Sequence, residues 1–168
     1  MERPFFVLVF GVLAPVTGSF ASSLASYPSD WKRWPMVNET VNVGRDVKLP
    51  ESASLFVQRT VARYSWINDG RGTAVHVYVH PDKLEQYKTH GPYTDGPTAI
   101  AIFQEPGIMF VTEHYAGIPL YGTYDLQGAD ISRQHPSFEV KACMACHEQF
   151  QDICVNGTCG DRVNAAFR

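Results

Sequence analysis

The residues with the clearest chemical potential lie near the C-terminus, where Cys143, Cys146 and His147 form the pentad Cys-Met-Ala-Cys-His. The spacing C-x-x-C-H is the attachment signature of a c-type haem. Two thiols three positions apart can add to the vinyl groups on one edge of the porphyrin, and the adjacent histidine can then ligate the iron. The sequence therefore predicts one covalently bound haem c, attached at the two cysteines, with His147 as the metal ligand.

Three other interpretations of the cysteines stay open. A redox-active C-x-x-C pair is the first, although such pairs normally follow a strand in a thioredoxin-like βαβ order. A zinc site that adds Cys154 and Cys159 is the second, although the spacing C-x2-C-x7-C-x4-C matches no common zinc finger. The third is a secreted domain with two disulfides and glycosylation sequons at Asn38 and Asn156.

Cys154 and Cys159 remain after the haem motif takes its two cysteines. They bracket Val-Asn-Gly-Thr, and Asn-Gly is a favoured tight turn that brings flanking residues together. We expect a disulfide that closes a small loop in an oxidising compartment. The alternative is that one thiolate serves as a haem ligand or a redox switch. A fixed loop would hold Lys141 and Arg162 near the haem propionates, where a cation offsets buried negative charge.

The first 21 residues have the three-part layout of a secretory signal peptide. A short polar start precedes an apolar stretch over residues 5–16, and small residues precede a cut after Ala21. Twelve apolar residues would span only about 18 Å of a hydrocarbon core of about 30 Å. The sequence predicts a signal peptide over 1–21, a single haem-binding domain over 22–168, and a soluble product in the periplasm.

The composition is that of one folded domain. The chain has 168 residues, of which 45% are hydrophobic and 12% aromatic, and a net charge of −3. This aromatic content and low charge exclude disorder over most of the length. No basic run occurs, so a nucleic-acid partner, which needs a concentrated positive face, is not expected.

Two short helices are expected before the haem motif. Residues 50–64 predict the first, with Ser52 or Ser54 as its N-cap. Its apolar side would comprise Leu55, Phe56, Val61 and Tyr64. Residues 81–89 predict a helix of about two turns that begins at a proline, a residue favoured at the first helical position.

Strands are expected between these helices and the motif. Residues 73–79 alternate between apolar and polar positions, which is typical of a half-buried strand. Further β-rich stretches lie at 98–103, 107–115 and 120–125, separated by glycine and proline. The sequence therefore predicts an α+β fold: an antiparallel β-sheet, a few short helices and a C-terminal haem-attachment segment.

The stretch from Ala74 to Phe103, AVHVYVHPDKLEQYKTHGPYTDGPTAIAIF, resembles the cytochrome P-460 and cytochrome c′-beta family. Members share a strand, a short helical turn, an Asp-Gly turn and a second strand. An early tryptophan-containing segment (here Trp31-Lys-Arg-Trp34) and a C-terminal C-x-x-C-H complete the pattern. The resemblance covers about residues 31–168. It implies an antiparallel β fold with haem on one face of the sheet, ligated by His147 alone.

One departure separates this chain from the catalytic branch of that family. In the P-460 branch a lysine on the strand after the Asp-Gly turn is cross-linked to the porphyrin, and hydroxylamine oxidation is associated with that chromophore. The matching position here is Ala101, or Ile102 or Phe103 in a shifted register. The cytochrome c′-beta branch has an apolar residue there, which caps the open iron face. The resemblance thus favours the c′-beta branch and argues against an enzyme.

The leading expectation is a periplasmic mono-haem cytochrome whose apolar distal pocket binds nitric oxide or carbon monoxide. An apolar face favours neutral diatomic ligands because nothing there can hydrogen-bond or replace them. An electron-transfer cytochrome with a second axial ligand and a periplasmic redox partner is the alternative. A hydroxylamine-oxidising cytochrome of the P-460 type is the third. A homodimer is compatible with all three.

The sequence offers a few candidates for the distal side of the haem, opposite His147. Glu113 lies in approximately the region of the family's distal carboxylate, although a solvent-exposed strand position explains it as well. His114 and Met109 are the residues to check for a sixth ligand, and Met36 is a further sulfur. Core packing accounts for both methionines. The other histidines, His76, His80, His90 and His135, lie near turns or strand ends, which is typical of surface or hydrogen-bonded positions.

Overall fold

The computed structural model describes residues 22–37 and 41–159. The expected signal peptide, the sequon at Asn38 and the cation Arg162 lie outside the described residues, and so do all other features predicted for those segments.

Within the described residues, one antiparallel sheet forms the centre of the fold, in the order β1-β2-β3-β4-β5. Its strands are β1 (Val41–Val43), β2 (Thr73–Val79), β3 (Gly96–Phe103), β4 (Ile108–Tyr115) and β5 (Ile118–Asp125). Each strand pairs with its neighbour in the sequence. Short turns join β3, β4 and β5, and such turns can join only antiparallel strands. The expected α+β class and the four predicted strands are confirmed; the short β1 was not predicted.

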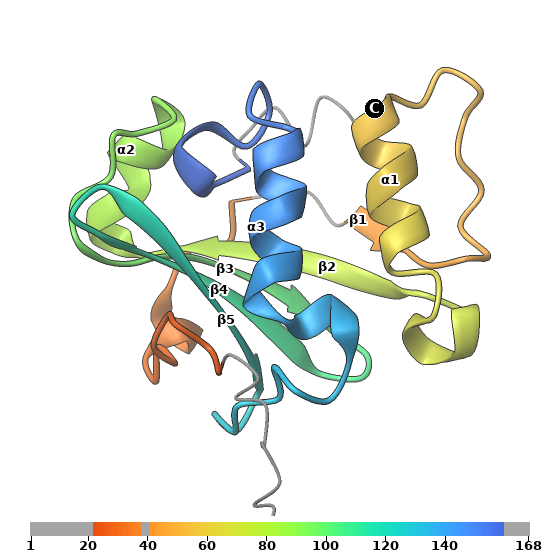
Figure 1. Ribbon diagram of the computed structural model, residues 1–168, viewed down its shortest axis with the longest axis horizontal. Helices are drawn as coiled ribbons and strands as arrows, with labels where there is room; N and C mark the ends of the chain where they lie inside the picture. Colours follow the sequence, from red (N-terminus) through yellow and green to blue (C-terminus); the bar gives the residue numbers. More distant parts are fainter. Residues whose placement is uncertain (1–21, 38–40, 160–168) are drawn as a thin grey trace, which may run out of the picture.

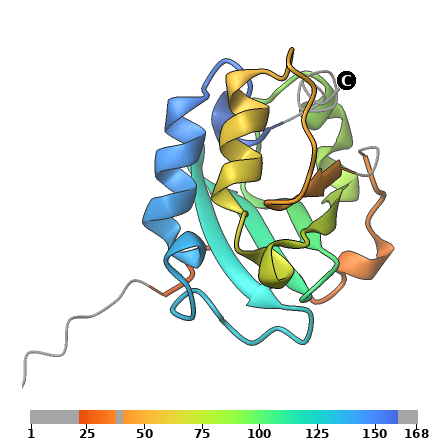
Figure 2. The ribbon, with the colours of Figure 1, turned by 90° about the vertical axis from the view of Figure 1, so that its right-hand side faces the viewer.

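Helices α1 (Leu55–Arg63) and α3 (Val140–Gln149) lie side by side over one face of this sheet (Figures 1 and 2), and the shorter α2 (Leu84–Lys88) follows β2. The N-terminal segment covers the opposite face, where Ala25 and Trp34 pack against the sheet. The sheet is therefore covered on both faces, and the C-x-x-C-H motif lies on the face that carries α1 and α3.

Helix α1 begins at the predicted cap. The Ser54 hydroxyl accepts a hydrogen bond from the Val57 amide at 3.3 Å, which satisfies one free amide of the first turn. The helix buries Phe56, Val57 and Val61, whereas Leu55 is 57% exposed. Placing Leu55 on the apolar side was wrong, because the buried side is turned one position further along the helix and includes Val57.

The start of α1 and the end of α3 pack together in one apolar cluster. The rings of Phe56 on α1 and Phe150, just after α3, have centroids 5.2 Å apart, and the buried Cys154 belongs to the same cluster. This packing fixes the distance between α1 and α3. The space between the two helices and the sheet is therefore a defined feature of the fold.

Candidate haem-binding site

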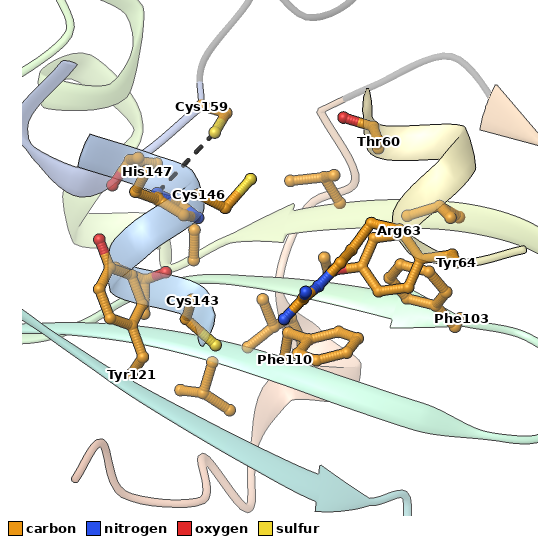
Figure 3. Close-up of a pocket in the computed structure, with 18 of the residues that line it drawn as sticks. Thr60, Arg63, Tyr64, Phe103, Phe110, Tyr121, Cys143, Cys146, His147 and Cys159 are labelled. Carbon is orange, nitrogen blue, oxygen red and sulfur yellow. Dashed lines mark hydrogen bonds between the residues drawn. The ribbon is translucent and has the colours of Figure 1, made fainter. Parts of the chain in front are cut away.

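An apolar pocket lies between α1, α3 and the sheet (Figure 3). Its cavity volume is about 200 Å³. The lining is mainly aliphatic and aromatic, and includes Val41, Val43, Phe56, Val75, Val77, Ala99, Ala101, Phe103, Phe110 and Tyr64. A lining of this kind suits an apolar group.

Helix α3 brings the three motif residues to this pocket. Cys143, Cys146 and His147 all line it, because positions three and four residues apart share one face of a helix. Both cysteines are free thiols in the structure. A helix was not predicted here. Its geometry places the two thiols and the imidazole of the C-x-x-C-H motif on one side of an apolar pocket.

The two thiols differ from those of a redox-active pair. Burial raises the pKa of Cys143 to about 11 and also raises that of Cys146. Redox-active C-x-x-C cysteines have a lowered pKa because they lie at a helix N-terminus or beside a cation. Cys143 is instead the fourth residue of α3, beyond the strongest effect of the helix dipole. These protonated thiols give the thioredoxin-like interpretation no support.

His147 is held in a neutral form. Burial lowers its pKa to about 4, and a hydrogen bond with the backbone of Gly157 opposes the shift. Its Nδ1 lies 3.9 Å from Cys159 Sγ, and its ring centroid lies 4.8 Å from that of Tyr121. In Figure 3 the other ring nitrogen points towards Cys146 and the pocket. A neutral imidazole with one nitrogen held and the other directed at the pocket is the form that ligates a metal.

Arg63, the last residue of α1, extends into the pocket opposite α3 (Figure 3). Its charge lowers the pKa of both motif thiols, against the larger effect of burial. No carboxylate is among the described residues that line the pocket. Arg63 was not predicted as a site residue. The sequence indicated only that it lies near the C-terminus of a capped helix.

The cation expected from the sequence lies elsewhere. Lys141 is directed to solvent, with 81% of its side chain exposed, and forms an ion pair with Glu139 at 2.6 Å. It does not line the pocket. Arg63 therefore replaces Lys141 as the candidate partner for a negatively charged group in this pocket.

The three candidate distal residues on β3 divide between the two faces of the sheet. Ala101 and Phe103 line the pocket, and Ala101 is paired with Val77 and Phe110. Ile102 instead packs with Met109 on the opposite face. Including Ile102 in the site was wrong, because successive side chains of a strand point to opposite faces.

Ile102 offers a test of this division. It is 1% exposed, so Ile102→Ala will lower the free energy of unfolding by about 2–5 kcal/mol through lost burial and a cavity. Ligand binding in the pocket will be unchanged at temperatures where the variant is folded. Denaturant unfolding measures the first effect and ligand titration the second; an altered ligand affinity in the folded variant would contradict the assignment of faces.

The other sequence candidates also lie away from the pocket. Met109 is fully buried on the opposite face, and Met36 is 50% exposed. Glu113 is half-buried rather than exposed, and its carboxylate accepts a hydrogen bond from the Ser26 amide at 2.7 Å. None of these residues lines the pocket. The core packing expected of Met109 is confirmed, and that expected of Met36 is wrong.

His114 has a structural role instead. Its Nδ1 lies 2.7 Å from Thr98 Oγ1 and its Nε2 lies 2.8 Å from the Asn156 carbonyl oxygen. A carbonyl can only accept, so Nε2 carries the proton and Nδ1 accepts from the threonine hydroxyl. Burial lowers the pKa of His114, which agrees with this neutral form. Both nitrogens are engaged, and His114 ties β4 to the segment after α3.

The predicted disulfide between Cys154 and Cys159 is confirmed. Its sulfurs and the ring of His147 have potential ligand atoms within 4.8 Å of one another. Sulfurs in a disulfide offer no thiolate to a metal, so this pairing contradicts the four-cysteine zinc interpretation. The free thiols of Cys143 and Cys146 likewise contradict a domain with two disulfides.

Comparisons with known proteins add no assignment. No protein-family model matches the chain, and no curated protein and no solved structure shows significant similarity to it. In the part of the chain that the structure describes, no helix has the length and apolar character needed to cross a membrane. The assignment of the site therefore rests on its own residues.

Proposed function

We propose that the protein is a periplasmic mono-haem c-type cytochrome of the cytochrome c′-beta kind that binds nitric oxide or carbon monoxide. The observation that supports this best is the face of α3 on which two free thiols and a neutral histidine line an apolar pocket. Thioether bonds from Cys143 and Cys146 would hold the haem, and His147 would ligate its iron.

The pocket residues have distinct roles in this proposal. Haem iron supplies a coordination position for a diatomic ligand. Ala101 and Phe103 offer that ligand an apolar wall without a hydrogen-bond donor. Tyr121 packs against the His147 ring and restricts its rotation, while Arg63 provides a positive charge for a propionate.

Neither alternative function has a comparable observation in its favour. An electron-transfer cytochrome with two axial ligands needs a second histidine or methionine at the pocket, and His114 and Met109 lie outside it. A hydroxylamine-oxidising cytochrome of the P-460 type would have its cross-linking lysine there, and no lysine is among the described lining residues.

Carbon monoxide binding tests the proposed function. The spectrum of the purified ferrous protein will shift when carbon monoxide is added, because the described pocket lining offers no histidine or methionine besides His147 as a competing ligand. Ala101→Phe will slow carbon monoxide association, since a ring at this position restricts steric access. A haem-loaded ferrous protein whose spectrum does not change on addition of carbon monoxide would refute the ligand-binding proposal.

Arg63 supports a second measurement. Arg63→Gln will lower the reduction potential by on the order of tens of millivolts, because a nearby cation favours the ferrous state with its smaller positive charge. Arg59→Gln is the matched control, since Arg59 belongs to the same helix and does not line the pocket. Spectroelectrochemical titration compares the two variants; equal potentials would exclude Arg63 as a partner of the haem.

A further inference from the structure

The segment from Cys154 to Cys159 contacts the imidazole ring of His147. Cys159 Sγ lies 3.9 Å from His147 Nδ1 (Figure 3), and the backbone of Gly157 is hydrogen-bonded to the imidazole. This segment therefore contacts the nitrogen that would not bind the iron. For a metal-bound histidine, the partner of that second nitrogen fixes both the tautomer and the ring orientation.

Three side chains hold the backbone of this segment in place. The carbonyl oxygen of Asn156 accepts a hydrogen bond from His114 Nε2 at 2.8 Å. Those of Gly157 and Cys159 accept hydrogen bonds from the hydroxyls of Tyr121 and Tyr87, both at 3.2 Å. Burial raises the pKa of Tyr121, so its hydroxyl stays a donor. The donors come from α2, β4 and β5, and the segment is thereby fixed to the sheet.

The turn itself depends on close packing. Gly157 has a φ of +75°, and a Cβ at this position would lie 2.3 Å from Pro119 Cβ. Only glycine fits this approach. Its carbonyl oxygen, which receives the Tyr121 hydrogen bond, is therefore presented close to His147 by the conformation of the turn.

The disulfide closes this segment at both ends. Cys154 is 2% exposed and belongs to the cluster with Phe56 and Phe150, whereas Cys159 is partly buried, packs against that cluster and lines the pocket. The bond thus joins a residue anchored in the apolar core to one beside His147. Opening it would free Cys159 and the turn before it from that anchor and leave the hydrogen bonds from His114, Tyr121 and Tyr87 to hold the segment.

We propose that the Cys154–Cys159 disulfide is a redox-sensitive clamp on the axial histidine, an inference that rests on the proposed haem function. A dithiol reductant opens the clamp: its thiolate attacks Cys159 Sγ, the more accessible sulfur, and Cys154 leaves as a thiolate that takes up a proton. The second thiol of the reductant then displaces Cys159 as a thiol, and the reductant leaves as its own disulfide. The thioethers to the haem contain no disulfide and are unaffected.

An open clamp changes the iron through its ligand. With the segment held less firmly, the His147 imidazole loses its fixed hydrogen-bond partner and becomes a weaker, less oriented ligand. Loss of such a partner typically costs 10–100-fold in metal affinity or activity. We therefore expect carbon monoxide to dissociate from the ferrous protein about tenfold faster, the lower end of that range.

The test uses the haem-loaded protein, kept ferrous throughout so that the reductant does not change the iron. Resonance Raman gives the iron–histidine stretching frequency, and stopped flow gives the carbon monoxide dissociation rate, before and after dithiol treatment. Alkylation and mass spectrometry verify that Cys154 and Cys159 have opened. A lower stretching frequency and faster dissociation are expected after opening, and the Cys154→Ser/Cys159→Ser variant will match the opened protein.

A second variant keeps the test independent of the disulfide's effect on folding. Tyr121→Phe retains the ring against His147 but removes the hydrogen bond to Gly157, and it will shift the same two measurements in the same direction while the disulfide stays closed. An opened disulfide with unchanged frequency and rate overturns the clamp. A chain that carries no haem overturns the proposed function instead, so the two failures are distinguishable.

Discussion

The Cys143→Ala/Cys146→Ala variant will carry no covalently bound haem, whereas the unaltered chain will carry one. The two cysteines are the free thiols that the structure describes, and both line the pocket. Without them no thioether can form, and any haem that enters the pocket is extracted by acidified organic solvent. Haem staining after denaturing electrophoresis measures the difference, which is a loss of essentially the whole signal.

Cys154→Ser/Cys159→Ser is the matched control for this prediction. It also removes two cysteines from the C-terminal region, but those two form the disulfide. Haem staining will persist in this control. If the first variant retained covalent haem, or if only the control lost it, attachment at Cys143 and Cys146 would be refuted.

His147→Ala will separate ligation from attachment. The haem will stay bound through the two thioethers, but the spectrum of an imidazole-ligated iron will disappear, because His147 is the histidine that lines the pocket. Added imidazole will restore that spectrum, since the deleted side chain leaves space in the pocket for it. Absorption and resonance Raman spectra of the ferrous protein measure both steps.

His76→Ala is the control for the ligand prediction. His76 lies on β2 outside the pocket lining, and its ring contacts Gln104. Its replacement will leave the spectrum unchanged. An unchanged spectrum in His147→Ala would mean that another group ligates the iron, and the central assignment of the site would fail.

The sheet was predictable from sequence because its signals are local. In β2, alternation places Val75 and Val79 on one face, and the structure buries both. The strand β1 was missed because three residues are too few to show a period. Helix α3 was missed because its polar and small residues give no clear apolar side, and only Val140 is buried in it.

The site was predictable where its residues are adjacent in the sequence. Cys143, Cys146 and His147 form one motif, and their spacing alone placed them together. Arg63 and Tyr121 reach the same pocket from α1 and β5, and only the packing of those elements brings them there.

Two of the candidate residues depended on features that a single sequence does not contain. Ile102 was included because the register of β3 was open by one residue, and one residue exchanges the two faces of a strand. His114 was considered because histidine is a common ligand, yet its two nitrogens already bond to Thr98 and Asn156. Neither the face nor the hydrogen-bond partners can be derived from a single sequence.

The most direct test of the central claim is the intact mass of the chain exported by a host that attaches haem c. We predict one species, heavier than the mature chain by one haem and lighter by the two hydrogens of the Cys154–Cys159 disulfide. Peptide mapping will place the haem on the peptide that contains Cys143 and Cys146. A haem-free mature chain, with both of these thiols open to alkylation, would refute haem attachment at Cys143 and Cys146.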